Sequence, residues 1–208
     1  MELEYLGGNC IKLTTKKATL VVDDSDLSKL GAKQLPKTPA ISLYTTANET
    51  KSQAEFVFDA PGEYEVHDIS IQGIAARSFG SEPEAKNNTI YRLVVDDTRV
   101  VIAGNIVPDL SDDQLEAIGT VDILFVPVGG GGAVLDGVGA LKLIKKIEPK
   151  LIVPTYYADK GLKYNPMPVE LSLALKELSM EPAETVESLK IKGREVAENT
   201  QLIVIKRQ

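Results

Sequence analysis

Short stretches in which apolar residues alternate with polar ones, or run together, fill the first half of the chain and predict β-strands. Gly-Gly, Lys-Lys and Asp-Asp pairs separate them, as is typical of the turns of hairpins. The predicted strands of this half are Leu3–Leu6, Cys10–Thr14, Ala18–Val22, Ala40–Tyr44, Phe56–Phe58, Ile69–Ala75 and Thr89–Val95. Asp96-Asp97 then forms a tight turn into another β-branched run. This half is therefore predicted to be mainly β-sheet.

In the second half, helical periodicity begins to alternate with strands. Ser111 and Gln114 resemble a capping box that opens a short helix ending near Ile118. Apolar residues recur every three or four positions from about Asp136 to Ile147, which predicts an amphipathic helix. The other predicted elements are the strands Asp122–Val128, Leu151–Pro154, Leu189–Ile191 and Gln201–Ile205, and a helix opened by Pro168 that carries Val169, Leu171, Leu173, Leu175 and Leu178. Together the two halves predict two sheets covered by helices.

Length and composition favour one globular domain over residues 1–208, with 43% hydrophobic and 25% charged residues. The net charge of −7 argues against binding to nucleic acid, which needs a positive field. The longest apolar runs are too short to cross a membrane, and the first residues lack the pattern of a signal peptide. One cysteine cannot form an intramolecular disulfide, so we expect a cytoplasmic protein.

Several strings along the chain resemble the metallo-β-lactamase superfamily, and its small, cytoplasmic, lactonase-like hydrolases in particular. The strings PGEYEV and PVGG, in this order and spacing, make the resemblance specific, and it extends from Glu2 to about Leu178. The others are LGGNC, ATLVVDD, ISLYTTANET, NNTIYRL, IAGN and IEPKLIVPTYY. The resemblance implies an α+β fold, a four-layer αββα sandwich, with the active site at one edge of the two packed sheets.

The same resemblance implies a zinc site whose ligands are missing here. The family's H-x-H-x-D-H motif falls on Thr45, Ala47, Glu49 and Thr50. A further histidine falls on or near Ser78, the bridging aspartate falls on Asn105, and the last histidine falls on Tyr156. Ala47 has no donor atom, neutral hydroxyls are poor ligands for a dication, and one carboxylate, Glu49, does not hold Zn²⁺. We therefore expect no metal cofactor.

Three further features that could be catalytic or bind a metal are predicted to have structural roles. His67, the only histidine, matches no ligand position of the family and is predicted to lie in a hairpin turn. Cys10 is predicted to be a small buried side chain, because it lies in a strand with no basic neighbour. The acidic cluster Asp23, Asp24 and Asp26 is interpreted as a solvated turn, with an open Ca²⁺ site as the alternative.

The glycine-rich segment Gly129–Gly132 follows a strand and precedes a helix, a layout in which backbone N–H groups bind anions. It lacks the spacings of the known phosphate-binding loops, and the family has glycines here for close packing. Because of their place between a strand and a helix, Gly129 and Gly130 nevertheless remain candidates for ligand binding. Asp136 is predicted to cap the next helix, with a place in the wall of the cleft as the alternative.

These observations favour a degenerate relative of the hydrolases, without zinc and without catalysis, that binds a small molecule or a protein partner at the sheet edge. One alternative is a hydrolase that uses another metal, held by Glu49, Asp136 and backbone oxygens, or a metal-free acid–base pair. A second alternative is a regulatory or structural subunit that pairs with an active paralogue. The sequence leaves self-association open and does not identify the ligand.

Overall fold

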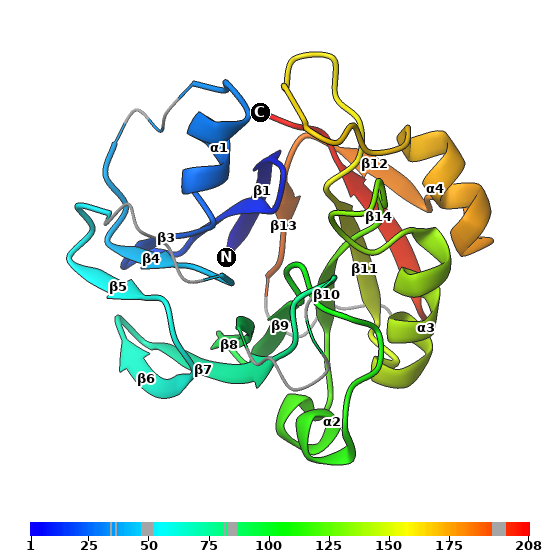
Figure 1. Ribbon diagram of the computed structural model, residues 1–208. Helices are drawn as coiled ribbons and strands as arrows, with labels where there is room; N and C mark the ends of the chain where they lie inside the picture. Colours follow the sequence, from blue (N-terminus) through cyan, green and yellow to red (C-terminus); the bar gives the residue numbers. More distant parts are fainter. Residues whose placement is uncertain (34, 36, 47–51, 81, 83–86, 193–198) are drawn as a thin grey trace.

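Two β-sheets packed face to face form the centre of the protein (Figure 1). The computed structural model describes residues 1–33, 35, 37–46, 52–80, 82, 87–192 and 199–208. The six-stranded sheet has the order β13 (Leu189–Lys190), β1 (Glu2–Gly7), β2 (Cys10–Thr14), β3 (Thr19–Val22), β4 (Ile41–Leu43) and β5 (Phe56–Phe58). The eight-stranded sheet has the order β12 (Glu184–Val186), β14 (Gln201–Ile205), β11 (Leu151–Thr155), β10 (Ile123–Pro127), β9 (Thr98–Ile102), β8 (Asn88–Val95), β7 (Ile69–Ala76) and β6 (Gly62–Val66).

Both sheets are mixed, and their parallel parts end at one edge of the molecule. In the first sheet β3, β4 and β5 are parallel, and in the second sheet β9, β10, β11 and β14 are parallel. Every residue of β10 and β11 is buried, as expected for parallel strands covered on both faces. The loops that follow these strands gather side chains from both sheets.

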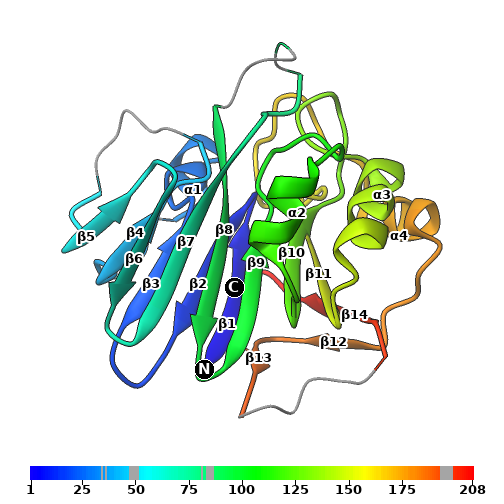
Figure 2. The same ribbon diagram turned by 90° about the horizontal axis from the view of Figure 1, so that it is seen from below.

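Within the described ranges the helices are α1 (Ser25–Lys29), α2 (Asp112–Ile118), α3 (Gly137–Ile147) and α4 (Leu171–Leu178). Figure 2 shows α2, α3 and α4 on the side of the eight-stranded sheet. On the outer face of the other sheet, Leu27 of α1 packs against Cys10 and Val21 in an apolar cluster separate from the main core. The predicted αββα order of layers is therefore confirmed, with a thin helical layer on the α1 side.

The hairpin turns and helix caps agree with the sequence. His67 and Asp96 both have positive φ, of 53° and 48°, and so do the aspartates that follow them, which is the type I′ geometry of two-residue hairpins. Ser111 and Gln114 form the predicted capping box of α2. The Asp136 carboxylate accepts a 2.7 Å hydrogen bond from the Gly139 N–H and so caps α3 as predicted.

Four elements differ from the predictions. The helix α1 and the strand β12 were not predicted because they are short, and the strand β6 was not predicted although its residues alternate along GEYEV. The helix expected to open at Pro168 begins at Leu171. Its expected first turn stays extended because the Val169 N–H donates to the Gly129 carbonyl. No helix in the described ranges is both long and apolar enough to span a membrane.

Candidate functional site: a polar edge between the sheets

Polar side chains from both sheets meet where the parallel strands end, and we call this group the polar edge. Its members are Asn9, Asp23, Thr45, Asn88, Asn105, Thr155 and Tyr156. Asp23 follows β3, Thr45 lies two residues after β4, Asn105 lies three residues after β9, and Tyr156 follows β11. Clefts of α/β proteins form at this end of parallel strands, so these positions share the edge at which a ligand would bind.

Thr45 is held against Asp23 at the centre of this edge. The Thr45 N–H donates to Asp23 Oδ1 at 2.8 Å, and the Thr45 hydroxyl donates to Asp23 Oδ2 at 2.7 Å. A Cβ added to Gly104 would lie 2.7 Å from the Cβ of Thr45, so Thr45 is also in close contact with the residue before Asn105. The first ligand position of the family is thus occupied by a hydroxyl that already has a partner.

Asn9 links the two sheets through its side-chain amide. Its Nδ2 donates to Asn105 Oδ1 at 2.6 Å, and its Oδ1 accepts from the Thr155 hydroxyl at 3.2 Å. Asn9 and Thr155 are only 3% and 2% exposed, so these bonds are shielded from water. Asn105, at the position of the family's bridging aspartate, therefore directs its amide oxygen at another amide.

Ser78 lies beside Asn105 through the backbone. It forms an isolated β-bridge with Ile106, and the N–H of the next residue, Phe79, donates to the Asn105 carbonyl at 2.8 Å. The structure thus brings Thr45, Ser78, Asn105 and Tyr156 to one edge through linked contacts. The other three predicted positions, Ala47, Glu49 and Thr50, lie outside the described residues.

Tyr156 closes the edge on the side of β11. Its ring lies 5.2 Å from the ring of Tyr164, and its N–H donates to the Gly8 carbonyl at 2.9 Å. The side chain is half-buried, and burial raises its pKa to about 12. The phenol therefore stays protonated at neutral pH. Within the described ranges its hydroxyl makes no hydrogen bond, so Tyr156 contributes through packing and its backbone.

The acidic cluster is not the solvated turn that the sequence indicated. Asp23 is 6% exposed, because its carboxyl group points at Thr45 instead of at solvent. Burial, and then the nearby Asp26, raise the pKa of Asp23 to about 8, although the bonds from Thr45 oppose this rise. Burial also raises the pKa of Asp26, which lies against Gly8. The raised pKa favours the protonated form of the Asp23 carboxyl group.

Asn88 adds an unpaired acceptor to the same edge. It is 2% exposed, and its Nδ2 donates to Thr46 Oγ1 at 3.2 Å and to the Asn105 carbonyl at 3.4 Å. Its Oδ1 is buried and has no hydrogen-bond partner among the described residues. Buried acceptors are normally paired, so an unpaired one indicates a place for an ordered water or a donor group of a ligand.

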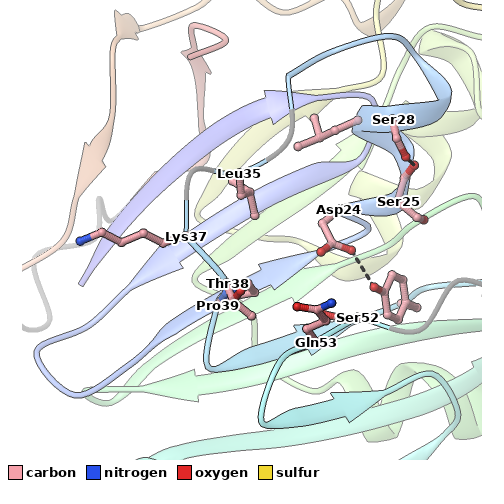
Figure 3. Close-up of a pocket in the computed structure, with 11 residues that line it drawn as sticks. Asp24, Ser25, Ser28, Leu35, Lys37, Thr38, Pro39, Ser52 and Gln53 are labelled. Atoms are coloured by element: carbon pink, nitrogen blue, oxygen red, sulfur yellow. Dashed lines mark hydrogen bonds between the residues drawn. The ribbon is translucent and has the colours of Figure 1, made fainter.

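A cavity of about 300 Å³ lies behind this edge, between α1, residues 35 and 37–39, and residues 52–53 (Figure 3). Asp24 points into it and accepts a 2.7 Å hydrogen bond from the Tyr44 hydroxyl. Thr45 bonds to Asp23 at the polar edge, whereas Tyr44 bonds to Asp24 in the lining of the cavity, so neighbouring residues of each segment serve the two regions. Serine and threonine hydroxyls and the Gln53 amide supply much of its remaining polar lining.

The glycine-rich segment forms the rim on the side of α3. A Cβ on Gly129 would lie 2.0 Å from the Tyr156 carbonyl oxygen, so this glycine permits a close approach of two backbones. The Gly130 N–H donates to the Leu135 carbonyl and is therefore already used within the loop. Anion binding by Gly129 and Gly130 remains a prediction, and Asp136 uses its carboxylate as a cap.

The described residues of the polar edge do not fit a hydrolytic zinc centre. Such a centre needs several imidazole, thiolate or carboxylate ligands, and among the described residues no three His, Cys, Asp or Glu are grouped to hold a metal. His67 lies at the opposite end of the sheets, where its neighbour Asp68 pairs with Lys17 of the β2–β3 turn. Cys10 is fully buried in the α1 cluster, and burial raises the pKa of its thiol.

Sequence reasoning missed four members of the edge. These are Asn9, Asp23, Asn88 and Thr155, whose hydrogen-bond partners are distant in sequence. Of the four, only Asp23 was considered from the sequence, as part of the acidic cluster. The motif DD after β3 could have identified Asp23, because its first residue continues a buried strand.

Comparisons with known proteins agree with this fold. Residues 2–156 match the family model described as the beta-lactamase superfamily domain. No curated protein matches the chain significantly.

Among solved structures, a protein of Thermotoga maritima, proposed to be a Zn-dependent hydrolase of the metallo-beta-lactamase superfamily, has a TM-score of 0.78 and 22% identity over 100% of this chain and 99% of its own. A proposed metal-dependent hydrolase of Parabacteroides distasonis has a TM-score of 0.65 and 16% identity, covering 99% of this chain and 93% of its own. The metallo hydrolase Igni18 of Ignicoccus hospitalis has a TM-score of 0.60 and 15% identity, with coverages of 92% and 99%. At these sequence identities the similarity shows a shared fold only.

Proposed function

The chain belongs to the metallo-β-lactamase superfamily, and from this premise we propose that it is a member without zinc and without hydrolytic activity that binds a ligand or partner at the polar edge. One observation carries the proposal. At two of the family's ligand positions the polar atoms are used within the protein, since Thr45 bonds to Asp23 and Asn105 bonds to Asn9. A metal ion would have to break both pairs, and the Thr45 hydroxyl and Asn105 amide that it would gain are neutral oxygen donors.

The ligand is expected to bind by hydrogen bonds. The unpaired Oδ1 of Asn88 calls for a donor, and the cavity in Figure 3 has a lining of hydroxyl, amide and carboxylate groups. At about 300 Å³ the cavity lies at the lower end of the range for small-molecule sites. Each feature by itself favours a compact polar molecule that carries hydroxyl or amine groups.

The test is a metal analysis joined to a turnover assay. Protein purified without chelator is expected to contain far less than one equivalent of Zn, Mn or Fe per chain. Added metal is expected to produce no hydrolysis of lactone, ester or phosphodiester probes. A family member with a complete ligand set, purified in parallel, serves as the positive control. One tightly held metal equivalent, or turnover that a chelator abolishes, would overturn the proposal.

Variants separate the proposal from the alternative of a different metal. That alternative requires Glu49 and Asp136 as carboxylate ligands, so Glu49→Gln and Asp136→Asn would each lower metal content and turnover. Our proposal expects neither variant to change either quantity. The Asp136→Asn variant is well matched, because asparagine also caps helices and preserves the bond to Gly139.

The alternative of a subunit that pairs with another chain draws on a different observation. Three of the exposed large hydrophobic side chains lie near the glycine-rich rim: Val138, Met167 and Leu173, which are 52%, 60% and 45% exposed. Gly131 contacts the backbone of Met167, and Gly137 contacts the backbone of α4 at Ala174. Light scattering across a concentration series, with Leu173→Ser for comparison, would detect self-association through this surface.

A further inference from the structure

A second cavity, of about 390 Å³, lies at the end of the eight-stranded sheet opposite the polar edge. Its lining residues stand where the parallel strands begin. Thr98 and Arg99 open β9, Asp122 precedes β10, and Lys150 precedes β11. The polar edge lies where these same strands end, so the two regions are separated by the length of the sheet. What binds in this cavity is therefore independent of the proposed function.

Three basic side chains converge on the cavity from three different strands or strand ends. Arg92 of β8 and Arg99 of β9 are diagonal neighbours on adjacent strands, because Arg99 pairs with Val94, two residues after Arg92. Such neighbours lie on the same face of a sheet, within reach of long side chains. Lys150 joins them from the start of β11. This concentration of positive charge stands out in a chain with a net charge of −7.

One carboxylate, Asp122, compensates part of this charge. It accepts from Arg99 Nε at 2.8 Å and Arg99 Nη2 at 3.0 Å, and the ammonium group of Lys150 lies 3.0 Å from it. Burial alone would raise the pKa of Asp122, but the hydrogen bonds from Arg99 and Lys150 lower it to about 2. Asp122 is therefore ionised and fully engaged with these two cations, which leaves it no capacity for Arg92.

Among the described residues, Arg92 has no anionic partner. Its Nε donates at 3.0 Å to the carbonyl oxygen of Ile118, the last residue of α2, and this acceptor is neutral. Its two terminal nitrogens make no hydrogen bond within the part of the chain that the structure describes. Arg92, Arg99 and Lys150 carry three positive charges, against the negative charges of Asp122 and, at the rim, Asp97. The lining thus has an excess of one positive charge and a half-buried guanidinium fork.

We propose that this cavity binds a small oxyanion, of the phosphate or carboxylate class, with Arg92 as its principal contact. The planar guanidinium offers two parallel N–H donors, which match two oxygens of such an anion. Lys150 adds a point charge beside it, and the cavity leaves space for a small organic group on the anion. A purely structural ion cluster would account for Asp122 and its two partners, but it does not account for the free end of Arg92.

The experiment is isothermal titration calorimetry on the full chain with inorganic phosphate, sulfate and succinate, at ionic strength held constant with sodium chloride. We expect saturable binding of one anion per chain. Binding of phosphate and sulfate without succinate identifies a phosphoryl-type ligand, and the reverse identifies a carboxylate. Arg92→Gln is expected to weaken binding at least tenfold, or about 1.4 kcal/mol. Arg77→Gln, the same change in charge at an arginine outside the cavity, is expected to leave the affinity unchanged.

Two results would overturn the proposal. The first is the absence of saturable binding of all three anions to the unaltered protein, a result that no folding defect of a variant can explain. The second is an equal loss of affinity in Arg92→Gln and Arg77→Gln, which would assign the binding to general charge. Thermal melting of both variants without anion checks their folding. Arg92→Lys, which keeps the charge without the fork, is expected to bind with intermediate affinity.

Discussion

Replacing Asp23 by asparagine should change the pH dependence of stability more than stability itself. The asparagine side chain can accept from the Thr45 N–H and donate to the Thr45 hydroxyl, so it preserves both contacts of the carboxyl group. It cannot titrate. The native Asp23 pKa is about 8, raised by burial and by Asp26, whereas the ordinary value is 3.8. The two values define the pH range in which the native and unfolded chains differ in bound protons.

The sign follows from that difference. Between about pH 5 and pH 7 the native chain keeps the Asp23 proton and the unfolded chain has lost it, so the free energy of unfolding falls as pH rises. One proton corresponds to a slope of about 1.4 kcal/mol per pH unit, so the loss approaches about 2.7 kcal/mol over two units. Acids whose pKa is lowered, such as Asp122, act in the opposite direction, and only near and below their ordinary pKa.

Urea unfolding at pH 5, 6 and 7 measures this slope. We expect the unaltered protein to lose stability across the range and Asp23→Asn to remove most of the loss. Asp113→Asn, at an exposed carboxylate of α2, is the control and should retain the slope. Equal slopes in the unaltered protein and in Asp23→Asn would show that Asp23 is already ionised in the native protein and would refute the reasoning.

Two further predictions concern the rim of the polar edge. Gly129→Ala should destabilise the protein by about 3 kcal/mol, because its Cβ would lie 2.0 Å from the Tyr156 carbonyl oxygen. Gly132→Ala should destabilise it by about 1 kcal/mol, because the added Cβ meets open space but the backbone has a φ of 78°. Equal costs in urea unfolding would contradict the close backbone approach. Tyr156→Ala should cost about 2 kcal/mol through lost packing on Tyr164, whereas Tyr156→Phe should change stability little, since the hydroxyl makes no hydrogen bond within the described ranges. A large cost of Tyr156→Phe in thermal or urea unfolding would show that the hydroxyl has a partner.

The sequence predicted the parts of the fold that depend on local pattern. Residues a few positions apart determine the periodicity of α3, its Asp136 cap and the hairpin turns at His67-Asp68 and Asp96-Asp97. The structure confirms each of these predictions. The helix α1 has five residues and was missed, because so short a segment has no measurable period. The resemblance to a family placed the edge of the sheets, which local pattern alone could not do.

The chemistry of that edge was harder to predict, because it depends on long-range pairs. From the sequence Asp23 resembles part of a solvated acidic turn, but in the structure Thr45, which follows the neighbouring parallel strand β4, donates two hydrogen bonds to it. The free end of Arg92 likewise has meaning only beside Arg99 and Lys150, which the fold brings together. Burial and charge compensation are properties of such groups, and no single stretch of sequence contains them.

The hydrogen bonds of Asn9 also constrain the order in which the parts of the protein can fold during synthesis. Its amide pairs with Asn105 and Thr155, which are 96 and 146 residues away along the chain. A nascent chain on the ribosome therefore carries β1 and β2 for most of its synthesis without the partners that join the two sheets. The edge can close only when β11 has emerged, so translation of the last quarter of the chain unites the two halves.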